Sequence, residues 1–233
     1  MVDGDHGGAP VWPAASLLGN LAPGPRGRLL ALGARVSYPA GRVLMRESEE
    51  STFVLVLLEG VVKATGRAGG EREALLAIRM GGDLVGEFAA LDGRPRSATV
   101  TTCGPVAARV VARADFVACL HRDPGLMHAV NRAVLAKLRT ANSHRLDLTG
   151  CDVATRLARV LHEVALTYGR RAGAGAEIPW PLTQPELASL AGAAEPTVHR
   201  VLRTLREKGV VATGYRTISI TDLARLRDIA FDK

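Results

Sequence analysis

The chain has 233 residues, enough for two domains that each bury their own core. Apolar residues make up 47% of it and aromatic residues only 4%, which suits short strands and tight turns better than a large aromatic-lined enzyme pocket. The net charge of +7 favours a polyanionic partner, because neutralised phosphates release their counterions.

The cysteines and the amino-terminal segment are typical of a cytoplasmic protein. Cys103, Cys119 and Cys151 are scattered and form no CxxC pair, which argues against a disulfide framework or a zinc site. The first residues form no basic leader, and the most apolar run, residues 54–62, is short and contains Glu59. We therefore expect a cytoplasmic protein with no signal peptide, membrane span or metal site.

The first half of the chain has the pattern of an antiparallel β-domain. Residues 1–16 are rich in Gly, Pro and Ala and are expected to form a flexible segment, and residues 17–32 could form one or two helical turns. From Arg35 to about Phe116, short apolar or alternating segments are separated by glycines. This pattern predicts a β-roll or barrel, and we assign residues 17–123 to it.

A long helix is predicted next, over residues 124–150. Met127, Val134, Ala141 and Leu148 recur every seven residues, with Leu138 between them. A second copy of the helix could cover this seam and form a homodimer. The alternative is an ordinary helix packed on its own β-domain.

Residues 151–233 are predicted to be rich in helix. A Gly-rich turn follows the first helix, two strands form a hairpin around residues 214–216, and Thr221 can cap a last helix that ends near residue 231. The expected helices and strands cover residues 152–168, 183–191, 196–208, 210–213 and 217–220.

Two of these helices have the pattern of a helix-turn-helix. Thr183 and Glu186 form a capping box, which marks a helix start, and Gly192 supplies a turn. The next helix carries an apolar stripe at helical spacing, formed by Val198, Val201, Leu202 and Leu205. With the hairpin behind them, these elements predict a winged helix-turn-helix.

The opposite face of that second helix is basic. It carries Thr197, His199, Arg200, Arg203 and Arg206, and arginine can contact guanine or hold phosphate. A solvated basic face is the alternative for a lone helix, but the surrounding motif favours DNA. Ala194 occupies the cap position of this helix but cannot cap through its side chain. Glu195, the next residue, either interacts favourably with the helix dipole or accepts a hydrogen bond from cytosine.

The β-domain contains one dense motif, residues 82–98. Gly86 allows the backbone to approach a ligand closely, and Glu87 can accept a hydrogen bond from a ribose hydroxyl. Arg96 can pair with a phosphate, to which Ser97 can donate. Without further evidence, an acidic and a basic residue that flank a turn are more often solvated side chains than parts of a ligand site.

The order and spacing of these motifs resemble the family of the catabolite activator protein and the fumarate-nitrate regulator, over about residues 17–225. Residues 86–98 resemble the family's phosphate-binding cassette, residues 152–159 the start of its DNA-binding domain, and residues 183–200 its helix-turn-helix. The resemblance implies an α+β protein with an antiparallel, cyclic-nucleotide-binding-like β-roll, a central dimerisation helix and a carboxyl-terminal winged helix-turn-helix.

The resemblance also implies roles for individual residues. Glu87 would contact the ribose, and Arg96 and Ser97 the cyclic phosphate. Bases would be read near Arg200, and phosphate held near Thr183. The predicted ligand-binding residues are Gly86, Glu87, Phe88, Arg96, Ser97, Ala98, Ala141 and Asn142. The predicted DNA-binding residues are Thr183, Gln184, Glu195, Pro196, Thr197, His199, Arg200 and Arg203.

The expected effector is cyclic AMP or cyclic GMP, with no prosthetic group. Members that respond to cyclic AMP place a hydroxyl on the central helix, where this chain has Ala141. Asn142 or Thr140 could read the base instead. The expected partners are a palindromic DNA duplex and a second copy of the chain, with RNA polymerase a further candidate.

Three alternatives remain. A relative of the same family could bind DNA without a ligand, or could sense haem through His6 or Cys103. An iron-sulfur cluster is disfavoured because the cysteines are not clustered. An enzyme that processes cyclic nucleotides is remote, because the sequence has no metal-ligand cluster, nucleophile elbow or P-loop. We therefore expect a regulator with no catalytic residues.

Overall fold

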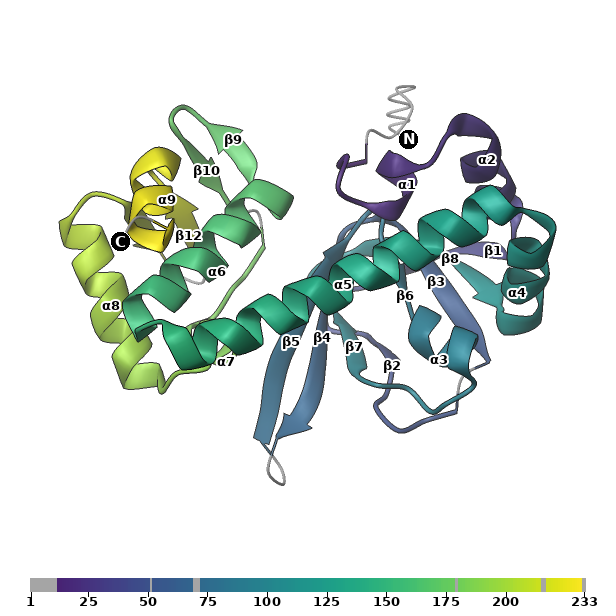
Figure 1. Cartoon of the computed structure of the whole chain (residues 1–233), viewed down its shortest axis with the longest axis horizontal. Coiled ribbons are helices and arrows are strands. Elements are labelled where there is room, and N and C mark those ends of the chain that lie inside the picture. Colours follow the sequence, from purple (N-terminus) through teal and green to yellow (C-terminus); the bar gives the residue numbers. More distant parts are fainter. Residues whose placement is uncertain (1–11, 51, 69–71, 179, 215–216, 232–233) are drawn as a thin grey trace, which may run out of the picture.

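The structure is a computed structural model that describes residues 12–231, apart from positions 51, 69–71, 179 and 215–216. A 27-residue helix, α5 (Pro124–Gly150), crosses the molecule and joins an amino-terminal β-rich domain to a carboxyl-terminal helical domain (Figure 1). The predicted α+β architecture, with a β-roll, a central helix and a helix-turn-helix, is confirmed.

The amino-terminal domain, here called the sensor domain, contains two four-stranded antiparallel sheets. The first sheet has the order β1 (Ala34–Tyr38), β8 (Val106–Ala112), β3 (Phe53–Glu59), β6 (Leu84–Val85). The second has the order β2 (Val43–Met45), β7 (Thr99–Thr102), β4 (Val61–Ala68), β5 (Arg72–Met80). Long-range pairs such as β3 with β8 bring together segments about 50 residues apart in the chain, as a roll requires.

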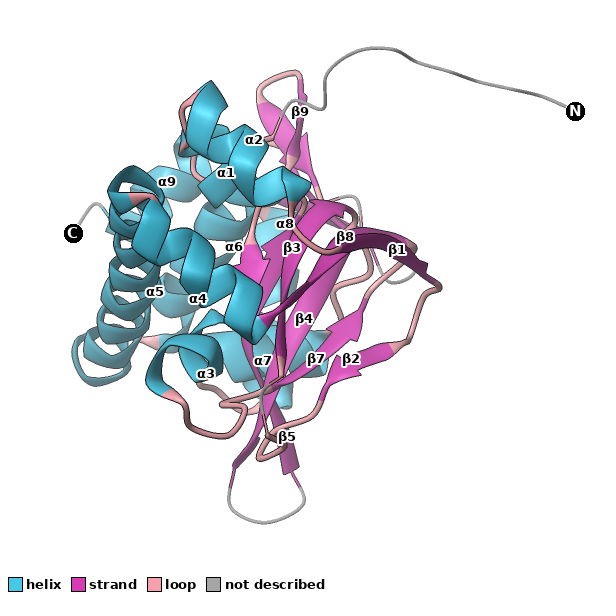
Figure 2. Cartoon of the chain, turned by 90° about the vertical axis from the view of Figure 1, so that its right-hand side faces the viewer, coloured by secondary structure: helices cyan, strands magenta, loops and turns pink. Residues whose placement is uncertain are grey.

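Strand β3 is buried on both faces, which explains why its sequence is continuously apolar rather than alternating. Leu55 and Leu57 point into a core between the sheets, while Val54 and Val56 belong to a second core under helices. A strand that is buried on both faces has no position at which a polar side chain would reach water. The helices gather on one side of the strands, as Figure 2 shows.

Helices α1 (Leu17–Asn20), α2 (Pro23–Ala31) and α4 (Arg113–Arg122) form that second core with the first half of α5. The segment before them was expected to be flexible through residue 16. Residues 1–11 lie outside the described part, but Trp12 donates a hydrogen bond to the Leu58 carbonyl at 2.9 Å. Ser16 is buried and caps α1, so residues 12–16 belong to the sensor domain.

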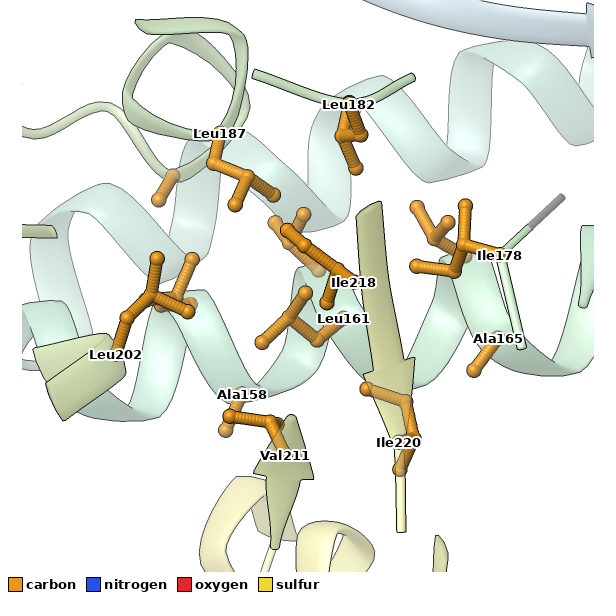
Figure 3. Packing of buried hydrophobic residues seen from close by; sticks show 14 of the residues in the cluster. Ala158, Leu161, Ala165, Ile178, Leu182, Leu187, Leu202, Val211, Ile218 and Ile220 are labelled. Atoms are coloured by element: carbon orange, nitrogen blue, oxygen red, sulfur yellow. The ribbon is translucent and has the colours of Figure 1, made fainter. Parts of the chain in front are cut away.

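The carboxyl-terminal domain is built around α6 (Val153–Tyr168). Its side chains pack with those of both helix-turn-helix helices and the wing in one apolar core (Figure 3). The remaining elements, in chain order, are β9 (Arg170–Ala172), β10 (Gly175–Glu177), α7 (Gln184–Ala191), α8 (Glu195–Glu207), β11 (Val211–Gly214), β12 (Thr217–Ile220) and α9 (Leu223–Phe231).

Two details of this domain differ from the prediction. The segment expected to be a Gly-rich turn at residues 169–175 contains a strand pair, β9 and β10, which extends the sheet of the wing. The last helix is capped by Asp222, whose Oδ1 accepts from the Arg225 amide at 2.9 Å. Thr221 lies one residue before this cap, and its hydroxyl donates to the Gly209 carbonyl. Residues 215 and 216 of the predicted hairpin turn lie outside the described residues.

The two domains also touch away from α5. Leu75 and Ile78 of β5 are buried in the core of the carboxyl-terminal domain. The Tyr168 hydroxyl donates to the Ile78 carbonyl at 2.7 Å, and Lys63 of β4 pairs with Glu186 of α7 at 2.5 Å. The β4–β5 hairpin therefore couples the sensor domain to the helix-turn-helix. In the described parts of the chain, no helix is both long and apolar enough to cross a membrane.

Candidate functional site

A cavity of about 640 Å³ lies where the sensor domain, α5 and the carboxyl-terminal domain meet. We call it the effector cavity. Seven of the eight predicted ligand-binding residues line it: Gly86, Glu87, Phe88, Arg96, Ser97, Ala98 and Ala141. The eighth, Asn142, is exposed and is not among the lining residues. A volume of this size is within the usual range for a small-molecule site.

Gly86 determines the shape of one wall. Its φ of 84° lies in the left-handed region, and it precedes the short helix α3 (Glu87–Asp92). A Cβ at this position would lie 2.3 Å from Nη1 of Arg96 and 2.7 Å from Cε of Met45. Glycine is therefore required both for the backbone conformation and for the close approach of Arg96.

Arg96 is fixed by the protein beside that turn. Only 5% of it is exposed, and its guanidinium donates to the carbonyls of Gly86 at 3.1 Å and Phe53 at 2.6 Å. The guanidinium also lies over the Phe53 ring, 4.8 Å from its centroid. Burial lowers the pKa of Arg96, and nearby Glu87 opposes that shift. The result is a rigid cation at the wall of a cavity, which suits a phosphate.

Glu87 is also buried, and its partner was not predicted from the sequence. Its Oε1 accepts from Nζ of Lys137 at 2.7 Å, and the same ammonium donates to the Leu84 carbonyl at 2.7 Å. Burial lowers the pKa of Lys137, and the charge of Glu87 opposes this. Lys137 also lines the effector cavity, so a polar ligand would meet both members of the pair.

On the central helix, Thr140 and Ala141 both line the cavity. One turn further along, Nε2 of His144 pairs with Oε2 of Glu163 on α6 at 2.8 Å. Asp147 pairs with Arg159 of α6 one turn beyond that. These two pairs bridge the bend between α5 and α6, and His144 and Glu163 line the cavity as well.

A second surface lies on α8. Val198, Leu202 and Leu205 are buried in the domain core, as the apolar stripe predicted. Of the six residues predicted to contact DNA on this helix, Thr197 is partly buried and the other five are exposed: Glu195, Pro196, His199, Arg200 and Arg203. The helix therefore presents a basic face to solvent, and its N-cap residue, Ala194, has no side chain that could cap the first turn.

Helix α7 holds the other predicted DNA contacts, Thr183 and Gln184, at its amino-terminal end, where both are partly buried. The Thr183 amide donates to Oε2 of Glu186 at 2.7 Å, so the predicted helix start is confirmed. Gly192 ends the helix with a φ of 57°. Arg156 of α6 donates to the carbonyls of Ala191 and Gly192, which fixes the turn between α7 and α8.

Comparisons with known proteins match both domains of the chain. A model of the cyclic nucleotide-binding domain matches residues 35–123, and a model of the Crp-like helix-turn-helix domain matches residues 155–229. The chain is 32% identical over 218 residues to the cyclic AMP receptor protein of Thermus thermophilus, covering 92% of this chain and 96% of that protein. This chain belongs to the Crp/Fnr family of transcription regulators.

Further similarities within the Crp/Fnr family extend over most of the chain. A CRP-like cAMP-activated global transcriptional regulator of Mycobacterium tuberculosis is 30% identical over 191 residues, or 82% of this chain and 85% of that protein. The structure of FixK2 from Bradyrhizobium japonicum superposes with a TM-score of 0.74 at 20% identity, covering 87% of this chain and 99% of that one. That likeness concerns the fold.

Two predictions about other Crp/Fnr chemistries can be compared with the structure. Of the two candidate haem ligands, His6 lies outside the described residues, and burial raises the pKa of Cys103 to about 11. A thiol with such a pKa is a poor metal ligand at neutral pH. Among the described residues, no group of three or more His, Cys, Asp or Glu side chains is placed to hold a metal ion.

Proposed function

We propose that this Crp/Fnr regulator binds cyclic AMP or cyclic GMP in the effector cavity and that the nucleotide controls its affinity for DNA. The observation that carries the proposal is the position of Arg96, a rigid buried cation beside Gly86, in a cavity that also reaches the DNA-binding domain. Arg96 and Ser97 would hold the cyclic phosphate, and Glu87 the ribose hydroxyl. A nucleotide there would lie between the domains whose arrangement it controls.

For DNA binding, we propose that α8 enters the major groove. Arg200 and Arg203 are exposed and could reach guanine edges or phosphates, while Thr183 and Gln184 would hold the backbone at the start of α7. A dimer would place two such helices about one turn of duplex apart and would read a palindromic site. RNA polymerase is a further candidate partner once the dimer is bound.

The dimer contact would lie on the part of α5 beyond Val134. The predicted seam began at Met127, but Met127 packs against its own sensor domain and Val134 lines the cavity. Further along, four leucines are 50% exposed or more: Leu135, Leu138, Leu146 and Leu148. Covering them with a second copy of the helix would remove this apolar surface from water.

Nucleotide and DNA affinity would be linked through the domain arrangement. Residues of β5, α5, α6 and α7 all line the cavity, so a bound nucleotide would contact four elements that can shift relative to one another. A ligand favours whichever arrangement gives it the better contacts, and its differential affinity sets the size of the shift.

The test is calorimetric titration of cyclic AMP and cyclic GMP into the wild type and Arg96→Ala, followed by selection of DNA sequences with and without each nucleotide. We expect one nucleotide to bind wild type, Arg96→Ala to lose most of that affinity, and a palindromic site to be enriched with that nucleotide. A wild type that binds neither nucleotide would refute the effector assignment while leaving DNA binding to be judged by the selection.

A second candidate is a regulator that needs no ligand. The observation in its favour is that Glu87 is paired with Lys137 and Arg96 is bonded to two carbonyls, so both residues have partners within the protein. Equal operator affinity with and without saturating nucleotide would support this candidate. Haem is tested separately, by the absorption spectrum of the purified protein.

A further inference from the structure

The DNA-binding domain supplies part of the wall of the effector cavity. Val160, Glu163, Val164 and Tyr168 of α6, with Leu190 of α7, line the same cavity as Arg96. A nucleotide held by its phosphate at Arg96 would share this cavity with side chains of the DNA-binding domain. Base recognition need not come from the central helix alone.

The polar groups on this side of the cavity are not equivalent. The Tyr168 hydroxyl already donates to the Ile78 carbonyl, and Ala141 offers only a methyl group. The side chain of Glu163 is 44% exposed, and one oxygen of its carboxylate, Oε2, is bonded to His144. Its other oxygen, Oε1, accepts no hydrogen bond from any described residue. This residue of the cavity lining thus has an acceptor with room for a donor.

We propose that Glu163 reads the nucleobase, by accepting a hydrogen bond from an amino group on the purine ring. The inference rests on the proposed function and deepens it, because it assigns the residue that selects a base with an amino group. Adenine and guanine both qualify, whereas an unsubstituted purine does not. Val160, Val164 and Leu190 supply apolar surface for the faces of the ring.

This assignment gives the base a direct role in coupling. Glu163 belongs to α6, which packs against both helices of the helix-turn-helix in one core. A base that donates to Glu163 would therefore tie the DNA-binding domain to a phosphate held in the sensor domain. The free energy of that hydrogen bond would be present only in the arrangement that brings Glu163 and the base together, as linkage requires.

The experiment compares three probes by calorimetry: cyclic AMP, cyclic GMP and the 3′,5′-cyclic monophosphate of unsubstituted purine riboside. The last keeps the phosphate, ribose and ring but has no amino group. We expect wild type to bind the better of the first two at least about tenfold more tightly than the third, because a site built to bond a donor rejects the analogue that lacks it. Which of the two binds better identifies the base.

Three variants separate base reading from a structural role. Glu163→Leu removes the acceptor and should reduce the affinity ratio to within about twofold, while Glu163→Gln keeps a carbonyl acceptor and should retain most of it. Asp147→Asn weakens the neighbouring pair with Arg159 without touching the cavity lining and should leave the ratio unchanged. A merely structural effect would change all three affinities together.

Two results would overturn the proposal. One is a wild type that binds the unsubstituted purine nucleotide as tightly as both others, and the other is a Glu163→Leu variant that keeps the wild-type ratio. In either case the nucleotide still binds, so the proposed effector class survives. If wild type bound none of the three probes, the effector class and the base reader would fail together.

Discussion

The effector cavity and helix α8 both present arginines, but the arginine of the cavity is buried and hydrogen-bonded, whereas those of α8 are exposed. Arg96 is 5% exposed and donates to two backbone carbonyls, and Glu87 beside it is paired with Lys137. Arg200 and Arg203 on α8 are exposed, and Arg203 makes a long contact of 3.7 Å with Glu207. One set of charges is built into the fold, and the other is left to solvent.

The difference follows from what each partner requires. A small ligand needs groups that are already fixed at the right positions, and burial with hydrogen bonds provides that rigidity at a cost in desolvation. A DNA duplex brings its own dense negative charge, so exposed and mobile cations suffice. Substitutions in the cavity should therefore change stability and ligand binding together, whereas substitutions of the exposed arginines of α8 should change mainly DNA affinity.

The largest effect is expected from breaking the buried pair. Lys137→Met leaves the Glu87 carboxylate buried without its cation, which should lower the free energy of unfolding by about 3–5 kcal/mol. The matched change at an exposed pair is Glu207→Gln, which removes the partner of Arg203 and should cost below about 1 kcal/mol. Chemical denaturation measures both, and similar losses would show that the cavity charges are less tightly coupled to the fold than their burial indicates.

A second effect separates backbone strain from crowding. Gly86 and Gly41 have φ values of 84° and 73°, so alanine at either should cost about 1 kcal/mol or more in backbone strain. No atom of a described residue lies within 4 Å of a Cβ at position 41, whereas a Cβ at position 86 collides with Arg96. Gly86→Ala should therefore cost about 2 kcal/mol more than Gly41→Ala.

The same pair of variants tests the ligand site. Displacement of the Arg96 guanidinium by Gly86→Ala should also weaken binding of the proposed nucleotide at least about tenfold, because one charge-assisted contact is lost. Gly41→Ala should leave that affinity unchanged. Thermal melts and calorimetry give the two readouts, and equal behaviour of the two variants would contradict the close packing at Gly86.

On α8, Arg200→Ala should weaken operator binding by about 1–3 kcal/mol, or roughly 5- to 150-fold, and leave the melting temperature nearly unchanged. Arg227→Ala is the control, because Arg227 is also exposed but lies on α9 and pairs with Asp228. Fluorescence anisotropy with a selected operator measures both. If the two variants weakened binding equally, the affinity for DNA would depend on the net charge of the protein rather than on contacts made by the exposed face of α8.

Much of this arrangement could be predicted from local patterns. The capping box at Thr183, the apolar stripe of α8 and the spacing between Gly86 and Arg96 each depend on residues close in sequence, and the structure places these residues as the patterns indicated. The strands β9 and β10 were missed because each has only three residues, and β9 is exposed throughout. Such segments carry neither an alternating pattern nor an apolar run.

The unpredicted parts depend on contacts between distant segments. Lys137 reaches Glu87 across 50 residues, and Glu163 reaches His144 only because the chain bends between α5 and α6. Capping of α9 was ambiguous for another reason. Thr221 and Asp222 are adjacent and both can cap. In the structure Asp222 accepts the cap hydrogen bond, while the Thr221 hydroxyl donates to the Gly209 carbonyl, 12 residues away.

The smallest effect concerns the half-exposed pair at that bend. Glu163 raises the pKa of His144 by accepting its hydrogen bond, and Asp147 adds to this, while partial burial opposes it. The folded state therefore binds the proton more tightly than the unfolded state, whose pKa is near 6.5. The stabilisation is fully present below that value and is lost as the pH rises through the raised pKa.

Because both side chains are partly exposed, the change should be below about 1 kcal/mol. Unfolding free energies of wild type and His144→Gln, measured at several pH values between about 5.5 and 8.5, isolate it as a difference that shrinks with rising pH. A difference that stayed constant would mean that His144 contributes by packing rather than by charge. In that case the electrostatic stabilisation of the bend would come from the ion pair between Asp147 and Arg159, one helical turn further along.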